Sequence, residues 1–148
     1  MNRILVAVDG SSAALKAVDF AADLANKYEA ELVLLTVVPH FSSQSDAAVE
    51  EYARVEHIQG PPIELALATA ESVLDGARGE ARAKGAIQIS AGPSFGDPAK
   101  EIVAAARDRQ VDLIVVGTRG HGRLAGLLLG SVAQKVVSLA HCPVVVVR

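Results

Sequence analysis

The chain has 148 residues, a formal net charge of −3 and a single cysteine, Cys142. This length predicts one domain over residues 1–148, and one cysteine excludes an internal disulfide. No apolar stretch reaches the roughly 18 residues of a membrane-spanning helix, and the first residues lack the apolar segment of a signal peptide. We therefore expect a cytoplasmic protein that does not enter membranes and, given its acidic balance, does not bind nucleic acid.

Five short apolar runs alternate with segments of helical periodicity. The runs cover residues 3–8, 31–38, 86–91, 111–116 and 143–147. They are apolar on both faces and rich in β-branched residues, as buried parallel strands are. The alternation of strand and helix predicts an α/β fold, a single doubly wound five-stranded parallel sheet with helices on both faces.

Helical periodicity covers residues 15–28, 67–81, 98–109 and 131–140. Ser11 or Ser12 is placed to cap the first of these helices, and Asp97 followed by Pro98 is typical of a helix start. The sequence from Ser131 to Gln134 fits a capping box for the last helix. Residues 41–62 lack a clean period, and we expect a mobile connection there with a helical turn around 47–55.

The segment GTRGHGRLAGLLLGS, residues 117–131, holds five glycines, two arginines, a histidine and no acid. It leaves the carboxyl end of the fourth expected strand and ends where a helix begins. Ligands of open α/β sheets bind outside the carboxyl ends of the strands, and helix N-termini attract anions. Glycine lets a backbone approach such an anion closely. The segment therefore predicts a phosphate-binding loop, with a glycine-rich surface turn as the alternative.

Charge is distributed unevenly along the chain. Residues 113–148 contain no acid and carry +4, whereas the remainder carries −7, from 10 basic and 17 acidic residues. A positive segment on an acidic protein suggests a local anion site. A chance distribution in a short segment is the alternative.

Two common phosphate motifs do not fit this loop. The interval from Gly117 to Gly122 matches a Walker loop, but Arg123-Leu124 replaces the required Lys-Ser/Thr. Gly120 to Ala125 matches a loose dinucleotide fingerprint, but no acid follows about 20 residues later to bind a ribose. What remains is Gly117-x-x-Gly120, nine residues, then Gly130-Ser131.

With this spacing the chain resembles the ATP-binding branch of the universal stress protein family. The segments ILVAVDGS, VDLIVVGTRGHG, GSVAQKVV and HCPVVVV, and the Gly96-x-Pro98 helix start, are also similar to that family. The resemblance covers nearly the whole chain. It implies an ATP-binding protein, with Mg²⁺, that acts in regulation or the stress response through nucleotide-dependent conformation or partners.

The resemblance also implies which residues bind ATP. The cofactor-binding set is Val8, Asp9, Gly10, Ser11, Val38, Gly117, Arg119, Gly120, His121, Gly122, Gly130, Ser131 and Val132. In this mapping Asp9 lies near the ribose and is the candidate ligand for Mg²⁺, although a cap of the first helix is the alternative. The backbone at Val38 meets adenine. Whether Arg119 and His121 point toward phosphate or water stays open.

A weak ATP hydrolase or nucleotidyl-transfer enzyme on the same fold is the alternative function. Phosphoryl transfer needs a residue that orients the nucleophile, and the sequence offers no convincing candidate beside the loop. Pyrophosphatase relatives carry Gly-Gly-x-Asp-Ser after the first strand, whereas this chain has Asp9-Gly-Ser-Ser12. We assign no catalytic residue and expect at most a slow ATPase.

Several other residues have simpler interpretations. Asp112 begins its strand at the opposite end of the sheet and is expected to be structural. Cys142 is interpreted as a small buried hydrophobe. The four histidines show no zinc-ligand spacing. The leucines at 124 and 127–129 are interpreted as a packed turn.

The last strand, residues 143–147, predicts a homodimer. In the strand order of the resembled family it lies at a sheet edge, and the four residues after Pro143 are all valine. Edges are usually protected by lysines, bulges or cover, and this strand has none within it. A twofold axis would pair it antiparallel with its copy. Cover by a helix or by residues 41–62 is the alternative.

Overall fold

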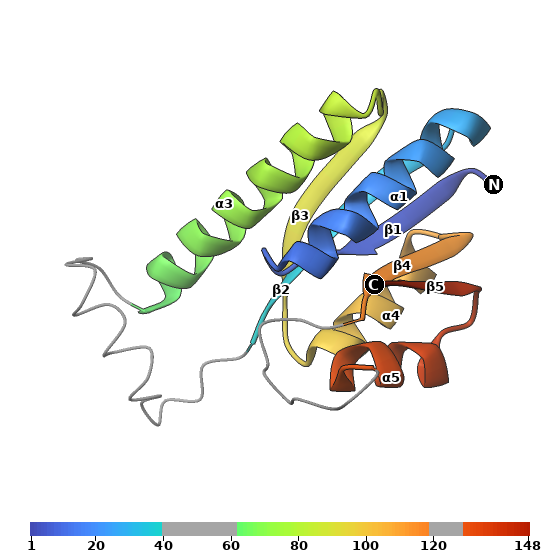
Figure 1. Cartoon of the computed structure of the whole chain (residues 1–148). Coiled ribbons are helices and arrows are strands. Elements are labelled where there is room, and N and C mark those ends of the chain that lie inside the picture. The colour runs from blue at the N-terminus through green and yellow to red at the C-terminus, as the bar shows by residue number, and fades with distance from the viewer. Residues whose placement is uncertain (40–61, 119–128) are drawn as a thin grey trace.

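The computed structural model describes residues 1–39, 62–118 and 129–148. The chain runs through β1 (Arg3–Ala7), α1 (Ser12–Tyr28), β2 (Glu31–Val38), α3 (Pro62–Ala83), β3 (Ile89–Phe95), α4 (Pro98–Asp108), β4 (Leu113–Gly117), α5 (Ser131–Leu139) and β5 (Val144–Val147) (Figure 1). The helical turn expected around 47–55 lies outside the described residues.

The strands form one parallel sheet in the order β3-β2-β1-β4-β5. Leu5 of β1 pairs with Val33 of β2 on one side and with Ile114 of β4 on the other. The chain builds outward from β1 to β3 and then returns to place β4 and β5 beyond the other side of β1. This order confirms the doubly wound α/β fold and locates its switch point between β1 and β4.

Alternate side chains of the central strands bury against two helical layers. Ile4 and Val6 pack with the apolar faces of α1 and α3, whereas Leu5 packs with α4 and α5. Each of these three side chains is fully buried. Burial of one such side chain stabilises the fold by roughly 1.5–3 kcal/mol. The two cores therefore fix which way each strand faces and hold its carboxyl end in place.

Two helix starts confirm the capping predictions. Ser11 is the N-cap of α1, and its Oγ accepts a hydrogen bond from the backbone N–H of Ala14 at 3.2 Å. Asp97 is the N-cap of α4, with Pro98 as the first helical residue, and its Oδ1 accepts from the N–H of Lys100 at 3.1 Å. Each side chain satisfies one of the backbone donors that a helix leaves open at its start.

The third strand is displaced from its predicted position. It covers Ile89–Phe95 rather than 86–91, and it includes Gly92 and Pro93. Residue preference fails here because pairing with the mostly apolar β2 decides the register, with Leu32 opposite Ile89 and Val38 opposite Phe95. Strands β3 and β5 are also only partly buried, because each lies at an edge of the sheet.

Asp112 lies at the amino end of the sheet and is structural, as predicted. Its Oδ2 accepts hydrogen bonds from the backbone N–H groups of Asn2, at 2.5 Å, and Arg3, at 3.0 Å. These two donors lower the pKa of the carboxyl group from its usual value. Cys142 is half-buried and packs against the α4–α5 core, and burial raises the pKa of its thiol. Among the described residues, every helix is too short or too polar to cross a membrane.

Candidate functional site

The carboxyl ends of β1, β2 and β4 meet at one edge of the sheet, beside the switch point. Val8, directly after β1, donates its N–H to the carbonyl of Leu35 at 2.8 Å. The hydroxyl of Thr36, which is buried, donates to the carbonyl of Val8. The backbone that leaves β1 is therefore held firmly on β2 before it turns.

The turn after β1 is built from Asp9, Gly10 and Ser11. Gly10 has a φ of 81°, a conformation that glycine adopts without strain. The Oδ1 atom of Asp9 accepts a hydrogen bond from the N–H of Ser11 at 2.9 Å. The N-cap of α1 is Ser11, so Asp9 supports the cap without occupying it, and the side chain of Asp9 is exposed at this edge.

Val38 ends β2, and its carbonyl accepts a hydrogen bond from the N–H of Gly96 at 3.0 Å. Gly96 has a φ of 145°, and a Cβ there would lie 2.9 Å from Oε1 of Glu101. Glu101 in turn accepts a hydrogen bond from the hydroxyl of Ser94. The conformation of residue 96 therefore favours glycine, whereas the Glu101 side chain could move away from a Cβ. The bond from Gly96 ties the end of β2 to the start of α4.

The glycine-rich loop begins and ends at neighbouring points of the backbone. Thr118, which follows β4, donates its N–H to the carbonyl of Val147 at 2.8 Å. The carbonyl of Thr118 accepts from the N–H of Gly130 at 2.7 Å. These bonds place the N-terminus of α5 beside the carboxyl end of β4. Sequence reasoning did not single out Thr118, and no local pattern marked it.

The capping box predicted at Ser131 is wrong. Gly130 is the N-cap of α5 and makes no side-chain capping bond. The side-chain amide of Gln134 instead donates to the carbonyl of Leu129 at 3.0 Å. The first turn of α5 contains no acid. Its first N–H groups, which receive no side-chain cap from Gly130, and the helix dipole together suit an anion.

Gly117 is the last residue of β4 and lies against the first turn of α1. A Cβ at this position would lie 2.8 Å from the backbone carbonyl carbon of Ala13. The end of β4 is therefore packed against the start of α1. This contact brings Gly117 close to the predicted site residues 8–11.

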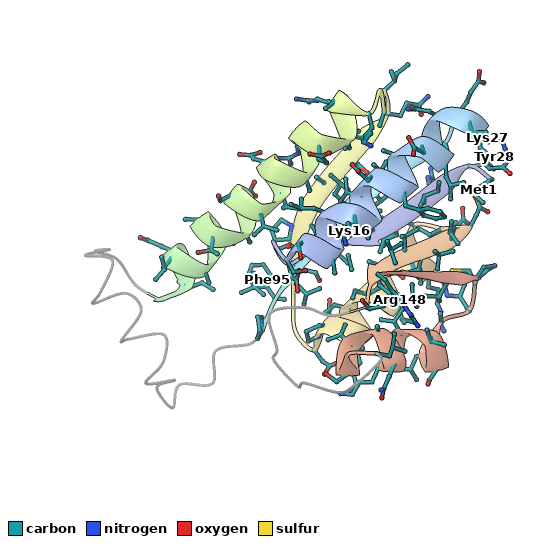
Figure 2. All side chains as sticks on the ribbon, in the orientation of Figure 1. Met1, Lys16, Lys27, Tyr28, Phe95 and Arg148 are labelled. Carbon is teal, nitrogen blue, oxygen red and sulfur yellow. The ribbon has the colours of Figure 1, made fainter. Side chains whose placement is uncertain are left out.

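The structure places all the members of the predicted set that it describes at one end of the strands. The segments 8–11 and 130–132 and the residues Val38 and Gly117 all lie at the carboxyl edge of the sheet. Figure 2 shows Lys16 in the first turns of α1 and Arg148 directly after β5, which adds two cationic side chains toward this end of the molecule. Arg119, Gly120, His121 and Gly122 lie outside the described residues, as do the leucines at 124, 127 and 128.

A metal ion at this site would take most of its coordinating oxygens from the bound phosphate and from water. Within residues 1–39, 62–118 and 129–148, no three Asp, Glu, His or Cys side chains cluster closely enough to hold an ion. Mg²⁺ is commonly bound through one or two carboxylates together with phosphate oxygens and water. The single exposed carboxylate of Asp9 fits that arrangement.

This fold and site define a doubly wound α/β protein with an anion-suited helix N-terminus at its switch point. The chain belongs to the universal stress protein family, whose model matches residues 1–148. It is 38% identical over 152 residues to Universal stress protein YxiE of Bacillus subtilis, with 99% of each chain covered.

Solved structures agree with this assignment. Universal stress protein UspA from Lactobacillus plantarum superposes with a TM-score of 0.79 at 29% identity, over 99% of this chain and 97% of the other. A universal stress protein crystallised in complex with cAMP gives a TM-score of 0.70 at 28% identity, over 99% of this chain and 96% of the other.

Proposed function

We propose that this protein binds ATP at the carboxyl edge of its sheet and acts through nucleotide-dependent conformation or partners. The observation that carries the proposal is the start of α5, where Gly130 leaves the first N–H groups without a side-chain cap beside the end of β4. Such a helix start binds phosphate through backbone donors and its partial positive charge. The cAMP complex of a relative supports an adenine nucleotide as the ligand.

In this proposal the two ends of ATP meet different segments. The adenosine lies against residues 8–11 and the backbone at Val38, and Asp9 binds the ribose or Mg²⁺. The phosphates lie against Gly130, Ser131 and Val132, with Gly117, Arg119, Gly120, His121 and Gly122 completing the loop. Bound Mg²⁺ would neutralise phosphate charge.

The first test is direct. Mass spectrometry of gently purified, denatured protein should detect co-purified ATP or ADP. Calorimetry should then show ATP binding that Gly120→Val abolishes, because a branched side chain intrudes where backbone meets phosphate. Circular dichroism checks that the variant is folded. A folded Gly120→Val protein with wild-type affinity would refute the assignment of the loop.

We also propose that the protein forms a homodimer through β5. The four valines of β5 are partly exposed, and within the described residues the strand pairs only with β4. Val147 directs its carbonyl to β4, where it accepts from Thr118. Since successive residues of a strand direct their backbone groups to opposite sides, Val144 and Val146 direct theirs to the open side.

The other edge of the sheet is protected. On β3, Pro93 has no N–H to offer, and the carbonyl of Ala91 accepts from Arg78 at 3.4 Å. In the part of the chain that the structure describes, β5 lacks the protection that β3 has at the opposite edge of the sheet, and this difference favours pairing through β5. Two copies joined about a twofold axis would close this contact on themselves.

Val146→Pro tests the dimer without disturbing the bonds to β4. Proline removes one outward N–H, and edge positions of this kind tolerate it. Sedimentation equilibrium should show a wild-type dimer and a folded Val146→Pro monomer. Val145→Pro is the contrasting variant, because it removes an inward N–H and should destabilise the sheet itself. A wild-type monomer at micromolar concentration would end the dimer proposal.

A further inference from the structure

Gly117 and Ala13 lie so close together that no residue with a Cβ fits at position 117 without a shift of the backbone. A Cβ at 117 would lie 2.8 Å from the carbonyl carbon of Ala13, 3.0 Å from its carbonyl oxygen and 3.0 Å from its Cβ. Two of these three atoms belong to the backbone, so no side-chain rotation relieves the overlap. One of the two segments would have to move.

Space, and not conformation, is what requires glycine here. The described glycines with positive φ are Gly10, Gly85 and Gly96, and Gly117 is not among them. An alanine could therefore adopt the backbone angles of Gly117 without strain. What it could not do is lie this close to the first turn of α1.

The other neighbours of Gly117 restrict how the overlap is relieved. Gly117 pairs with Val147 of β5, and the next residue, Thr118, bonds both to Val147 and to Gly130. Moving the end of β4 away from α1 would disturb these bonds and the start of α5 together. Moving α1 instead displaces Ser11, its N-cap, and the turn that carries Asp9.

We propose that Gly117 is a positioning residue that sets the spacing between the adenosine-binding segment 8–11 and the phosphate-binding start of α5. This inference rests on the proposed ATP function, and it gives Gly117 a role through packing in addition to its place in the proposed phosphate loop. A ligand that spans both segments depends on their spacing, whereas one that occupies a single segment does not.

The test compares ATP with adenosine in Gly117→Ala. ATP spans both segments, so its affinity should fall about tenfold or more, the equivalent of one lost hydrogen bond to a charged group. Adenosine, which lacks phosphates, should lose less than about threefold. A purely structural defect would lower the folded fraction and weaken both ligands equally. Calorimetry for ATP and competition for adenosine measure the two affinities.

Matched variants complete the experiment. Gly92→Ala is the control, because a Cβ on this β3 glycine meets no atom within 4 Å, and both affinities should stay at wild-type values. Adding Ala13→Gly to Gly117→Ala removes one of the three contacts and should recover part of the ATP affinity. If Gly117→Ala does not fold, Ala13→Val enlarges the same contact from the α1 side and should show the same selective loss.

The outcomes separate this inference from the proposed function. Equal loss of ATP and adenosine, or no loss of either in folded Gly117→Ala, would overturn the positioning role while ATP binding stands. A wild-type protein that binds no adenine nucleotide would instead refute the proposed function itself.

Discussion

Helices α4 and α5 both start at the carboxyl ends of the strands, but their N-termini are capped differently. At α4, the carboxylate of Asp97 caps the helix, and Glu101 adds an acid to the first turn. At α5, Gly130 offers no capping side chain, and the first turn has no acid. One helix start is satisfied by its own sequence, whereas the other is left suited to an external anion. The difference separates a helix start that its own sequence caps from one that suits the proposed ligand.

The largest expected effect comes from making α5 resemble α4. Gly130 has φ −68° and ψ 159°, angles that aspartate adopts without strain. Gly130→Asp would add a capping carboxylate and place a negative charge at the proposed phosphate site. We expect ATP affinity to fall by about 100-fold, from lost charge-assisted hydrogen bonds and added repulsion. Calorimetry measures the loss.

Gly130→Asn separates the two causes, since it caps the helix without charge. It should weaken ATP less than Gly130→Asp does. Both variants should keep wild-type stability to within a few tenths of a kcal/mol, because glycine is itself a tolerable N-cap. An unchanged ATP affinity in Gly130→Asp would show that the start of α5 is not the phosphate site.

A smaller effect comes from making α4 resemble α5. Asp97→Ala removes the capping bond to Lys100, and we expect the free energy of unfolding to fall by about 1 kcal/mol. ATP affinity should stay within about threefold of wild type, because the proposed site uses α5 and not α4 and only an exposed charge of α4 is lost. Urea unfolding gives the stability, and calorimetry on the folded variant gives the affinity. A large loss of ATP binding at wild-type stability would place α4 in the site.

The two helix starts also show what sequence can predict. The cap at Asp97 was predictable because its chemistry is local: aspartate, then proline, then an apolar stripe. The cap at Gly130 was missed because Ser131 and Gln134 match a capping box one residue later. What decides it is the bond from Gly130 to the carbonyl of Thr118, a contact across the loop that no local pattern contains.

The same distinction applies to the fold and the rest of the site. The strand and helix order followed from periodicity, and the ends of β1 and β4 were placed at one edge by the rules of parallel sheets. The position of β3 was not predictable from residue preference, since Gly92 and Pro93 are paired through the register with β2. The packing of Gly117 on Ala13 was also not predictable, because it joins two residues that lie 104 positions apart in the chain.

The smallest expected effect separates the charge of Asp97 from its capping bond. Asparagine caps a helix about as well as aspartate, so Asp97→Asn should keep stability within about 0.5 kcal/mol of wild type. It does remove the charge that lies 3.8 Å from Nζ of Lys135 on α5. Both side chains are well exposed, at 61% for Lys135 and 42% for Asp97, so this pair contributes little to stability.

Removal of that charge should instead appear in ATP binding. With Asp97 neutral, Lys135 adds an uncompensated positive charge near the start of α5, and ATP affinity should rise by less than about threefold at low salt. Raising the ionic strength should reduce the gain, because salt screens exposed charges. Calorimetry at two salt concentrations measures it, and Asp97→Asn in a Lys135→Ala background is the control, where the gain should shrink. A loss of stability as large as that of Asp97→Ala would mean that the charge, and not the hydrogen bond, is what caps α4.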